Sequence, residues 1–108
     1  MNYDTATHIY HQIKLSSFEN LRDALFRAAI EYAQIRARYR LATLEECLEM
    51  EQSRTLAHNA LISCCNSLSR NMAQRDENVE WRSLLGDDRK QIGDFACYLH
   101  CIFGIEVR

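Results

Sequence analysis

The sequence predicts a small all-α fold, a helical bundle of two long helices with a short helix and a C-terminal helix. Three observations favour helices over sheets: the 108 residues include no proline, they include three glycines, and no helix breaker lies between Leu15 and Gly86. Sheet-rich folds normally need glycines and prolines in their turns. Because 108 residues fit one domain and 47% of them are hydrophobic, we expect a single domain, 1–108, with a loosely attached N-terminal segment, 1–15.

The charge pattern divides the long stretch without breakers into two helices, about 17–41 and 44–74. Arginines crowd the end of the first range and glutamates the start of the second. This order suits helix dipoles, which are negative at the C-terminus and positive at the N-terminus. A single continuous helix, kinked near 41–42, is the alternative. The S/T-x-x-E spacing of a capping box occurs at both helix starts, as Ser16 with Glu19 and as Thr43 with Glu46.

The first long helix has a wide apolar face, which suits a bundle better than a two-stranded coil. A domain this small buries little apolar surface by itself, so we expect a homo-oligomer, a dimer as the natural completion. In the second long helix, residues 49–55 are mostly polar and are expected to face solvent or a partner. The apolar row of the first helix follows alternating steps of three and four residues: Phe18, Leu21, Leu25, Ala28, Tyr32, Ile35 and Tyr39.

Two shorter helices are expected on either side of this pair. One lies at about 5–14. The other, at 79–85, is capped by Asn78 and ends at Gly86 in a left-handed conformation. So short a helix is not stable alone, and we therefore expect Trp81 to dock it onto the long helices.

The last helix is expected at 89–103. Asp87 or Asp88 precedes it and can cap its first N–H groups. Gly104 is expected to end it, with Ile105 folding back onto the helix as in a Schellman stop.

The motif search favours a protein that is not an enzyme and has no cofactor. The three glycines are isolated, whereas P-loops and dinucleotide-binding turns need clustered glycines. The sequence also lacks the G-x-S-x-G, H-E-x-x-H, Glu-x-x-His and C-x-x-C patterns of hydrolases, metalloenzymes and redox proteins.

A metal or thiol redox sensor is a further alternative. The weak metal candidates are Cys97, His100 and Cys101 on the last helix. Either Cys64 or Cys65, together with His58, could complete the site from the second long helix. Their spacing matches no zinc signature. Gly93, Cys97 and Cys101 also form a row of small residues at i, i+4 and i+8, and this row is better interpreted as a close helix contact.

Nucleic-acid association is the alternative function that follows from an arginine cluster. The candidates are Arg36, Arg38, Arg40 and Arg54. The first three are alternate residues, which point about 200° apart on a helix and so form no single stripe. The formal net charge of −2 gives no general attraction to nucleic acid, so this function is less favoured.

The sequence also indicates a cytoplasmic protein that is not bound to membranes. Residues 1–12 have no basic cluster followed by an apolar run. No stretch approaches the roughly 18 apolar residues that span a bilayer. Five cysteines, an odd number without a secretion signal, suggest reduced thiols.

The densest mixture of Trp, Gly, Asp and Arg lies at 81–98, reading WRSLLGDDRKQIGDFACY. With its continuation LHCIFGIEVR, this stretch resembles the C-terminal signature of a small bacterial family, a domain of unknown function, through the run WR…LGDDR…IGDFACY. The resemblance implies a bacterial, cytosolic protein without an assigned activity. Our leading hypothesis is therefore a non-enzymatic protein-interaction or regulatory module. The candidate interaction surface comprises Trp81, Arg82, Asp87, Asp88, Arg89 and Asp94.

Overall fold

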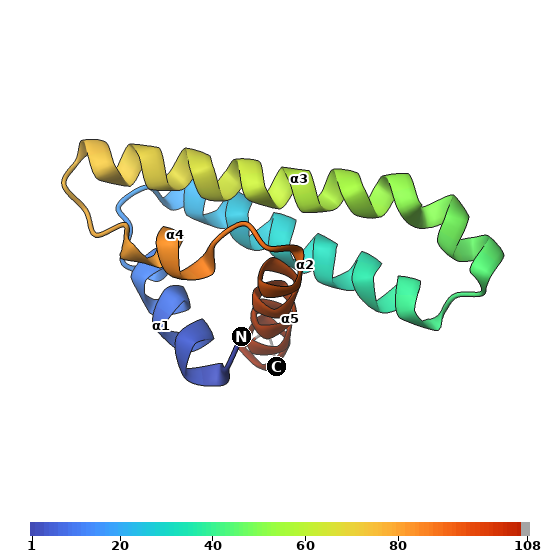
Figure 1. Ribbon diagram of the computed structural model, residues 1–108. Helices are drawn as coiled ribbons and strands as arrows, with labels where there is room; N and C mark the ends of the chain where they lie inside the picture. The colour runs from blue at the N-terminus through green and yellow to red at the C-terminus, as the bar shows by residue number, and fades with distance from the viewer. Residues whose placement is uncertain (107–108) are drawn as a thin grey trace.

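The computed structural model describes residues 1–106 and consists, over this range, of helices without strands (Figure 1). This confirms the all-α class, with two long helices, a short helix and a C-terminal helix. A further helix occupies the N-terminal segment. The elements are α1 (Tyr3–Lys14), α2 (Glu19–Leu41), α3 (Leu44–Gln74), α4 (Glu80–Leu85) and α5 (Arg89–Glu106).

An antiparallel hairpin of α2 and α3 forms the scaffold of the molecule (Figure 1). Two helices, and not one kinked helix, therefore occupy this part of the chain. Helix α2 packs against both α3 and α5, whereas α1 packs against α4 and α5. The turn that joins α2 to α3 projects beyond the three smaller helices (Figure 1). The molecule is accordingly elongated, with extents of 47 × 28 × 23 Å.

The hydrophobic core lies where the smaller helices meet the hairpin. Phe95 and Leu99 of α5 are fully buried there, together with Leu61 of α3. Ile9 and Ile13 of α1 are fully buried as well. The expectation of a loosely attached N-terminal segment is therefore wrong, because these two isoleucines lie one helical turn apart and both reach the core.

The starts of α2 and α3 differ in how they are capped. The capping box at α3 is confirmed: Thr43 Oγ1 accepts the N–H of Glu46 at 3.2 Å, and Thr43 donates its own N–H to Glu46 Oε1 at 3.2 Å. The expected box at α2 is wrong. Ser16 is buried two residues before the N-cap Phe18, whose N–H it accepts at 3.1 Å, so Glu19 is the first helical residue and not the third.

Helix α3 ends in a Schellman motif that we did not expect. Asp76 has a φ of 56°, in the left-handed region. Its N–H donates to the carbonyl of Ala73 at 3.1 Å, and the N–H of Glu77 donates to the carbonyl of Met72 at 2.9 Å. These two bonds satisfy carbonyl groups that the helix end would otherwise leave free.

The boundaries of α4 and α5 are partly as expected. Gly86 ends α4 with a φ of 65°, and the Asp88 carboxylate caps α5 by accepting two backbone N–H groups at 3.1 and 3.2 Å. The expected stop at Gly104 is wrong, since α5 continues through Gly104 and Ile105 to Glu106. Gly104 does not adopt the positive φ that a left-handed stop requires.

Candidate interaction surface

Trp81 belongs to the core and not to the surface. Its side chain is fully buried, and Trp81 and Leu85 are the buried residues of α4. Because α4 has six residues, it depends on such contacts for its stability. The expected burial of Trp81 is thus confirmed, although α4 packs chiefly against α1 and not against the two long helices. Trp81 is not accessible to an external partner.

The neighbours of Trp81 in the sequence serve local structure. Arg82 donates to Asn66 Oδ1 from two nitrogens, at 2.8 and 3.0 Å, and pairs with Asp87. Asp88 caps α5, and Arg89 is exposed beside it. The contacts of Arg82 therefore hold the α4–α5 connection against α3.

Asp94, the last member of the sequence-derived surface, links α5 to α2. Its carboxylate lies 3.5 Å from Arg36 Nη1, 3.4 Å from Lys90 Nζ and 3.0 Å from the amino group of Met1. Burial disfavours the charged form of Asp94, but the hydrogen bonds from the two ammonium groups outweigh it and lower its pKa below the usual value. Gly93 makes room for this contact, since a Cβ there would lie 2.7 Å from Arg36 Cζ.

The metal candidates do not converge. Cys97, His100 and Cys101 lie on α5, and Cys64 lies on α3. Within the described part of the chain, no three His, Cys, Asp or Glu side chains are grouped so that they could hold a metal ion. Burial raises the pKa of Cys65 to about 12, so this thiol stays protonated at neutral pH.

Gly93 and Cys97, two of the three small residues in the row on α5, make room for the side chain of Arg36 and not for the backbone of a neighbouring helix. Arg36 Nη1 lies 3.6 Å from Cys97 Sγ, and the same guanidinium covers Gly93. Cys101 is exposed. A hollow of about 600 Å³ lies between α5 and α2, next to Cys97. It is lined by Ala33, Gln34, Ala37, Arg38, Cys97, His100 and Cys101.

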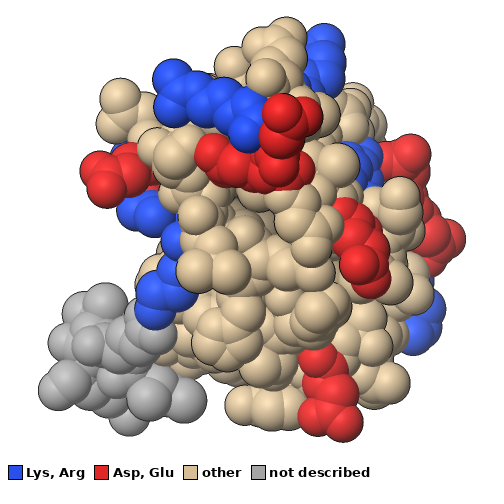
Figure 2. All heavy atoms as spheres, turned by 90° about the vertical axis from the view of Figure 1, so that its left-hand side faces the viewer, with Lys and Arg blue, Asp and Glu red and all other residues tan. Residues whose placement is uncertain are grey.

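The four arginines of the nucleic-acid hypothesis are not gathered on one surface. Arg36 is engaged with α5, and the Arg54 guanidinium lies 4.1 Å from the ring centre of Tyr39. Arg38 and Arg40 are exposed but point about 200° apart around α2. On the end of the molecule shown in Figure 2, acidic and basic side chains are also interspersed.

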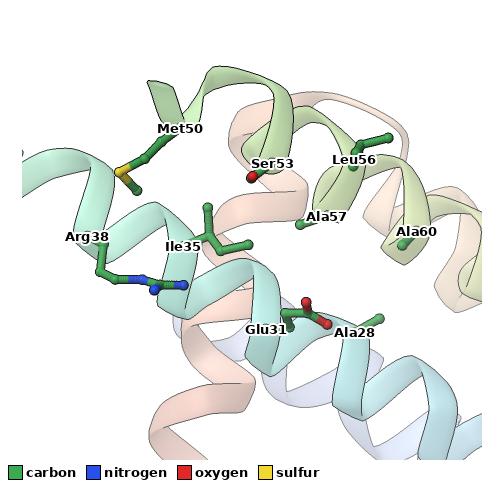
Figure 3. Close-up of a pocket in the computed structure, with 9 residues that line it drawn as sticks. All are labelled: Ala28, Glu31, Ile35, Arg38, Met50, Ser53, Leu56, Ala57 and Ala60. Carbon is green, nitrogen blue, oxygen red and sulfur yellow. The ribbon is translucent and has the colours of Figure 1, made fainter. Parts of the chain in front are cut away.

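A groove of about 560 Å³ lies between α2 and α3, and we call it the α2–α3 groove (Figure 3). Ile35 and Met50 point into it from the two helices. It opens away from α5, because Ile35 lies about 200° around α2 from Ala33, which faces α5. The lining residues are Ala28, Glu31, Ile35, Arg38, Met50, Ser53, Leu56, Ala57 and Ala60.

Glu31 and Arg38 are the two charged residues of this lining. Both are exposed, and neither forms an ion pair or hydrogen bond with another residue of the described chain. They stand seven residues, or about 10 Å, apart on the same side of α2. Sequence reasoning assigned Arg38 to nucleic acid and overlooked Glu31. Their opposite charges at a two-turn spacing were the signal that could have identified the pair.

Large apolar side chains are exposed along the same hairpin. Leu56, at the edge of the α2–α3 groove, is 60% exposed. Leu41, Leu44 and Leu48 are also exposed, around the projecting turn. Met50 and Ser53 of the polar stretch 49–55 line the groove. Exposed apolar groups that cluster in this way are typical of surfaces that bind other proteins.

Comparison with known proteins gives no guide to the function, since no protein-family model, curated protein or solved structure matches this chain. None of the helices within residues 1–106 is long and apolar enough to cross a membrane. A function must therefore be inferred from the geometry of the surface itself.

Proposed function

We propose that this chain is a non-enzymatic protein-interaction module that binds a helical partner through the α2–α3 groove. The proposal rests on the observation that the other helices cover only one side of the α2–α3 hairpin. Helices α1, α4 and α5 cover one side, while the other side keeps an open apolar groove. A helix hairpin normally buries both of its apolar sides, and an uncovered one marks a binding surface.

The lining of the groove suits a helix. Ala28, Ala57 and Ala60 carry only methyl side chains, so an incoming helix can approach to the usual interaxial distance of about 8–10 Å. Half-buried Met50 and exposed Leu56 offer larger apolar contacts, above a floor that includes the buried Ile35. The two charges, on Glu31 and Arg38, stand at the edge of an apolar floor, where they can orient a partner by pairing with its charges.

Other features favour this function over the alternatives. Two of the four candidate arginines, Arg36 and Arg54, are engaged within the protein, which weakens the case for a nucleic-acid interface. The five cysteines are all unpaired, and this supports our placement of the module in the cytoplasm, where thiols remain reduced.

Site-specific photo-crosslinking in cells tests the proposal. A photoreactive amino acid is placed at Leu56, beside the groove, or at Leu15, which is 84% exposed in the α1–α2 connection. The two sites match in residue type but only Leu56 borders the groove. We expect a cross-linked product from position 56 and little from position 15. No product from position 56, or equal products from both, would overturn the assignment of the groove.

A further inference from the structure

The two unpaired charges of the α2–α3 groove, on Glu31 and Arg38, both lie along the edge of the groove that α2 forms. The midpoint between positions 31 and 38 falls beside Ile35, which points into the groove (Figure 3). When two copies of α2 are laid antiparallel across a two-fold axis at this point, Glu31 of each copy faces Arg38 of the other. The groove edge is therefore complementary in charge to itself.

We infer that the partner in the groove is a second copy of this chain, packed open side to open side with the two α2 helices antiparallel. The inference rests on the proposed function and names its partner. A two-fold interface is self-complementary, so a contact between two residue types occurs twice. Each dimer then contains two Glu31–Arg38 pairs, one on either side of a two-fold axis that passes beside the buried Ile35.

The signs of the charges select the direction of packing. In a parallel arrangement about the same centre, Glu31 would face Glu31 and Arg38 would face Arg38. Like charges held together in this way oppose association, whereas opposite charges favour it and fix the register. The monomer offers neither residue a partner within its described part, so the pairs form without breaking existing ones.

The area of the open side is close to what a stable dimer requires. Helix α2 has 23 residues, which corresponds to a length of about 34 Å. Two adjacent helices are about 20 Å wide, so the open side offers about 700 Å² to a partner. Stable interfaces of ordinary size bury about 800 Å² on each partner. The same contact would also cover Leu56, which is 60% exposed.

Charge reversal in two separate variants tests the pairing. Glu31→Arg carries two positive charges at the groove edge, and Arg38→Glu carries two negative charges. Each variant should dissociate alone, with a dimer dissociation constant raised about 10- to 100-fold at low salt. Mixed together, the two variants are complementary again and should form a heterodimer. Glu80→Arg, an equal charge change on exposed α4, is the matched control and should leave the dimer intact.

Solution mass by light scattering at tens of micromolar gives the readout, with circular dichroism confirming that each variant is folded. Wild-type protein should have twice the chain mass of 12.6 kDa, each reversal alone 12.6 kDa, and the mixture twice the chain mass. A monomeric wild type, single variants that remain dimeric, or a mixture that stays monomeric would each overturn the inference. A Leu56 cross-link to a protein of another mass would then retain the proposed function while excluding self-association.

Discussion

Replacing Trp81 with alanine tests how the short helix α4 is held. The side chain is fully buried. A tryptophan buries about 150–250 Å², which at about 25 cal/mol per Å² corresponds to roughly 4–6 kcal/mol. Alanine retains part of this, so we expect a loss of about 3–5 kcal/mol in the free energy of unfolding. Since a domain of this size is stable by about 5–15 kcal/mol in total, the variant should be close to unfolding.

Two further variants test whether the loss of stability comes from the buried volume of the Trp81 side chain. Leu84, on the same helix, is 39% exposed, so Leu84→Ala should cost less than about 1 kcal/mol. The indole Nε1 of Trp81 has no hydrogen-bond partner among the described residues. Trp81→Phe removes this unsatisfied N–H group along with the lost volume, and should therefore cost clearly less than Trp81→Ala.

Urea unfolding followed by helical circular dichroism measures all three variants, since the wild-type fluorescence signal disappears with the only tryptophan. The emission of the wild-type protein gives an independent check and should be blue-shifted from that of tryptophan in water. A Trp81→Ala variant within about 1 kcal/mol of the wild type, together with water-like emission, would refute the docking role.

Three other predictions concern the helix ends and the thiols. Asp76→Gly should stabilise the protein by about 0.5–1 kcal/mol in thermal unfolding, because glycine adopts a φ of 56° without strain; a destabilised variant would contradict the Schellman geometry. Thr43→Ala should cost about 1 kcal/mol. Bonds from Thr43 lower the pKa of Glu46 from 4.5, so the part of the box made by the Glu46 carboxylate is present above pH 4.5 and is lost as the pH falls below it, whereas the bond from the Glu46 N–H to Thr43 Oγ1 remains; a wholly pH-independent difference between variant and wild type in acid titration would argue against the box. Native alkylation should label exposed Cys101 quickly and Cys65, whose pKa is about 12, only on unfolding; mass spectrometry showing early labelling of Cys65 would contradict its burial.

The hairpin could be predicted because its signals are local. The change from arginines to glutamates around Thr43 and the capping box with Glu46 both act within a few residues, and they fixed the turn correctly. The same spacing at Ser16 misled us. Ser16 is buried, and its hydroxyl accepts the N–H of Phe18 before the helix begins. The box pattern carries no information about that burial.

Other errors had a similar origin. Gly104 can end a helix, but here α5 continues through it, so the residue type permitted a stop without requiring one. The N-terminal segment seemed weakly patterned because only Ile9 and Ile13 marked an apolar side. Both side chains fit into a core to which all five helices contribute, most of them far away in the sequence.

The candidate site could not be predicted from the sequence, because it depends on which side of the hairpin the smaller helices cover. Ala28 and Ile35 belong to the expected apolar row of α2, and periodicity assigned them to the core. Ile35 is indeed buried and Ala28 half-buried, yet both also line the floor of a groove that they share with Met50 and Ala57 of α3. The sequence does not distinguish Arg36 from Arg38, yet Arg36 forms an ion pair with α5, while Arg38 lies between the α2–α3 groove and the hollow beside α5.

The most direct test of a dimer through the α2–α3 groove is an isotope-filtered nuclear Overhauser experiment on a mixture of labelled and unlabelled chains, which detects only contacts between copies. We expect contacts between copies from the Glu31 side chain to that of Arg38, and from the exposed Leu56 side chain to the second copy. Contacts confined to Leu44 and Leu48 at the projecting turn, or no contacts between copies at all, would contradict it.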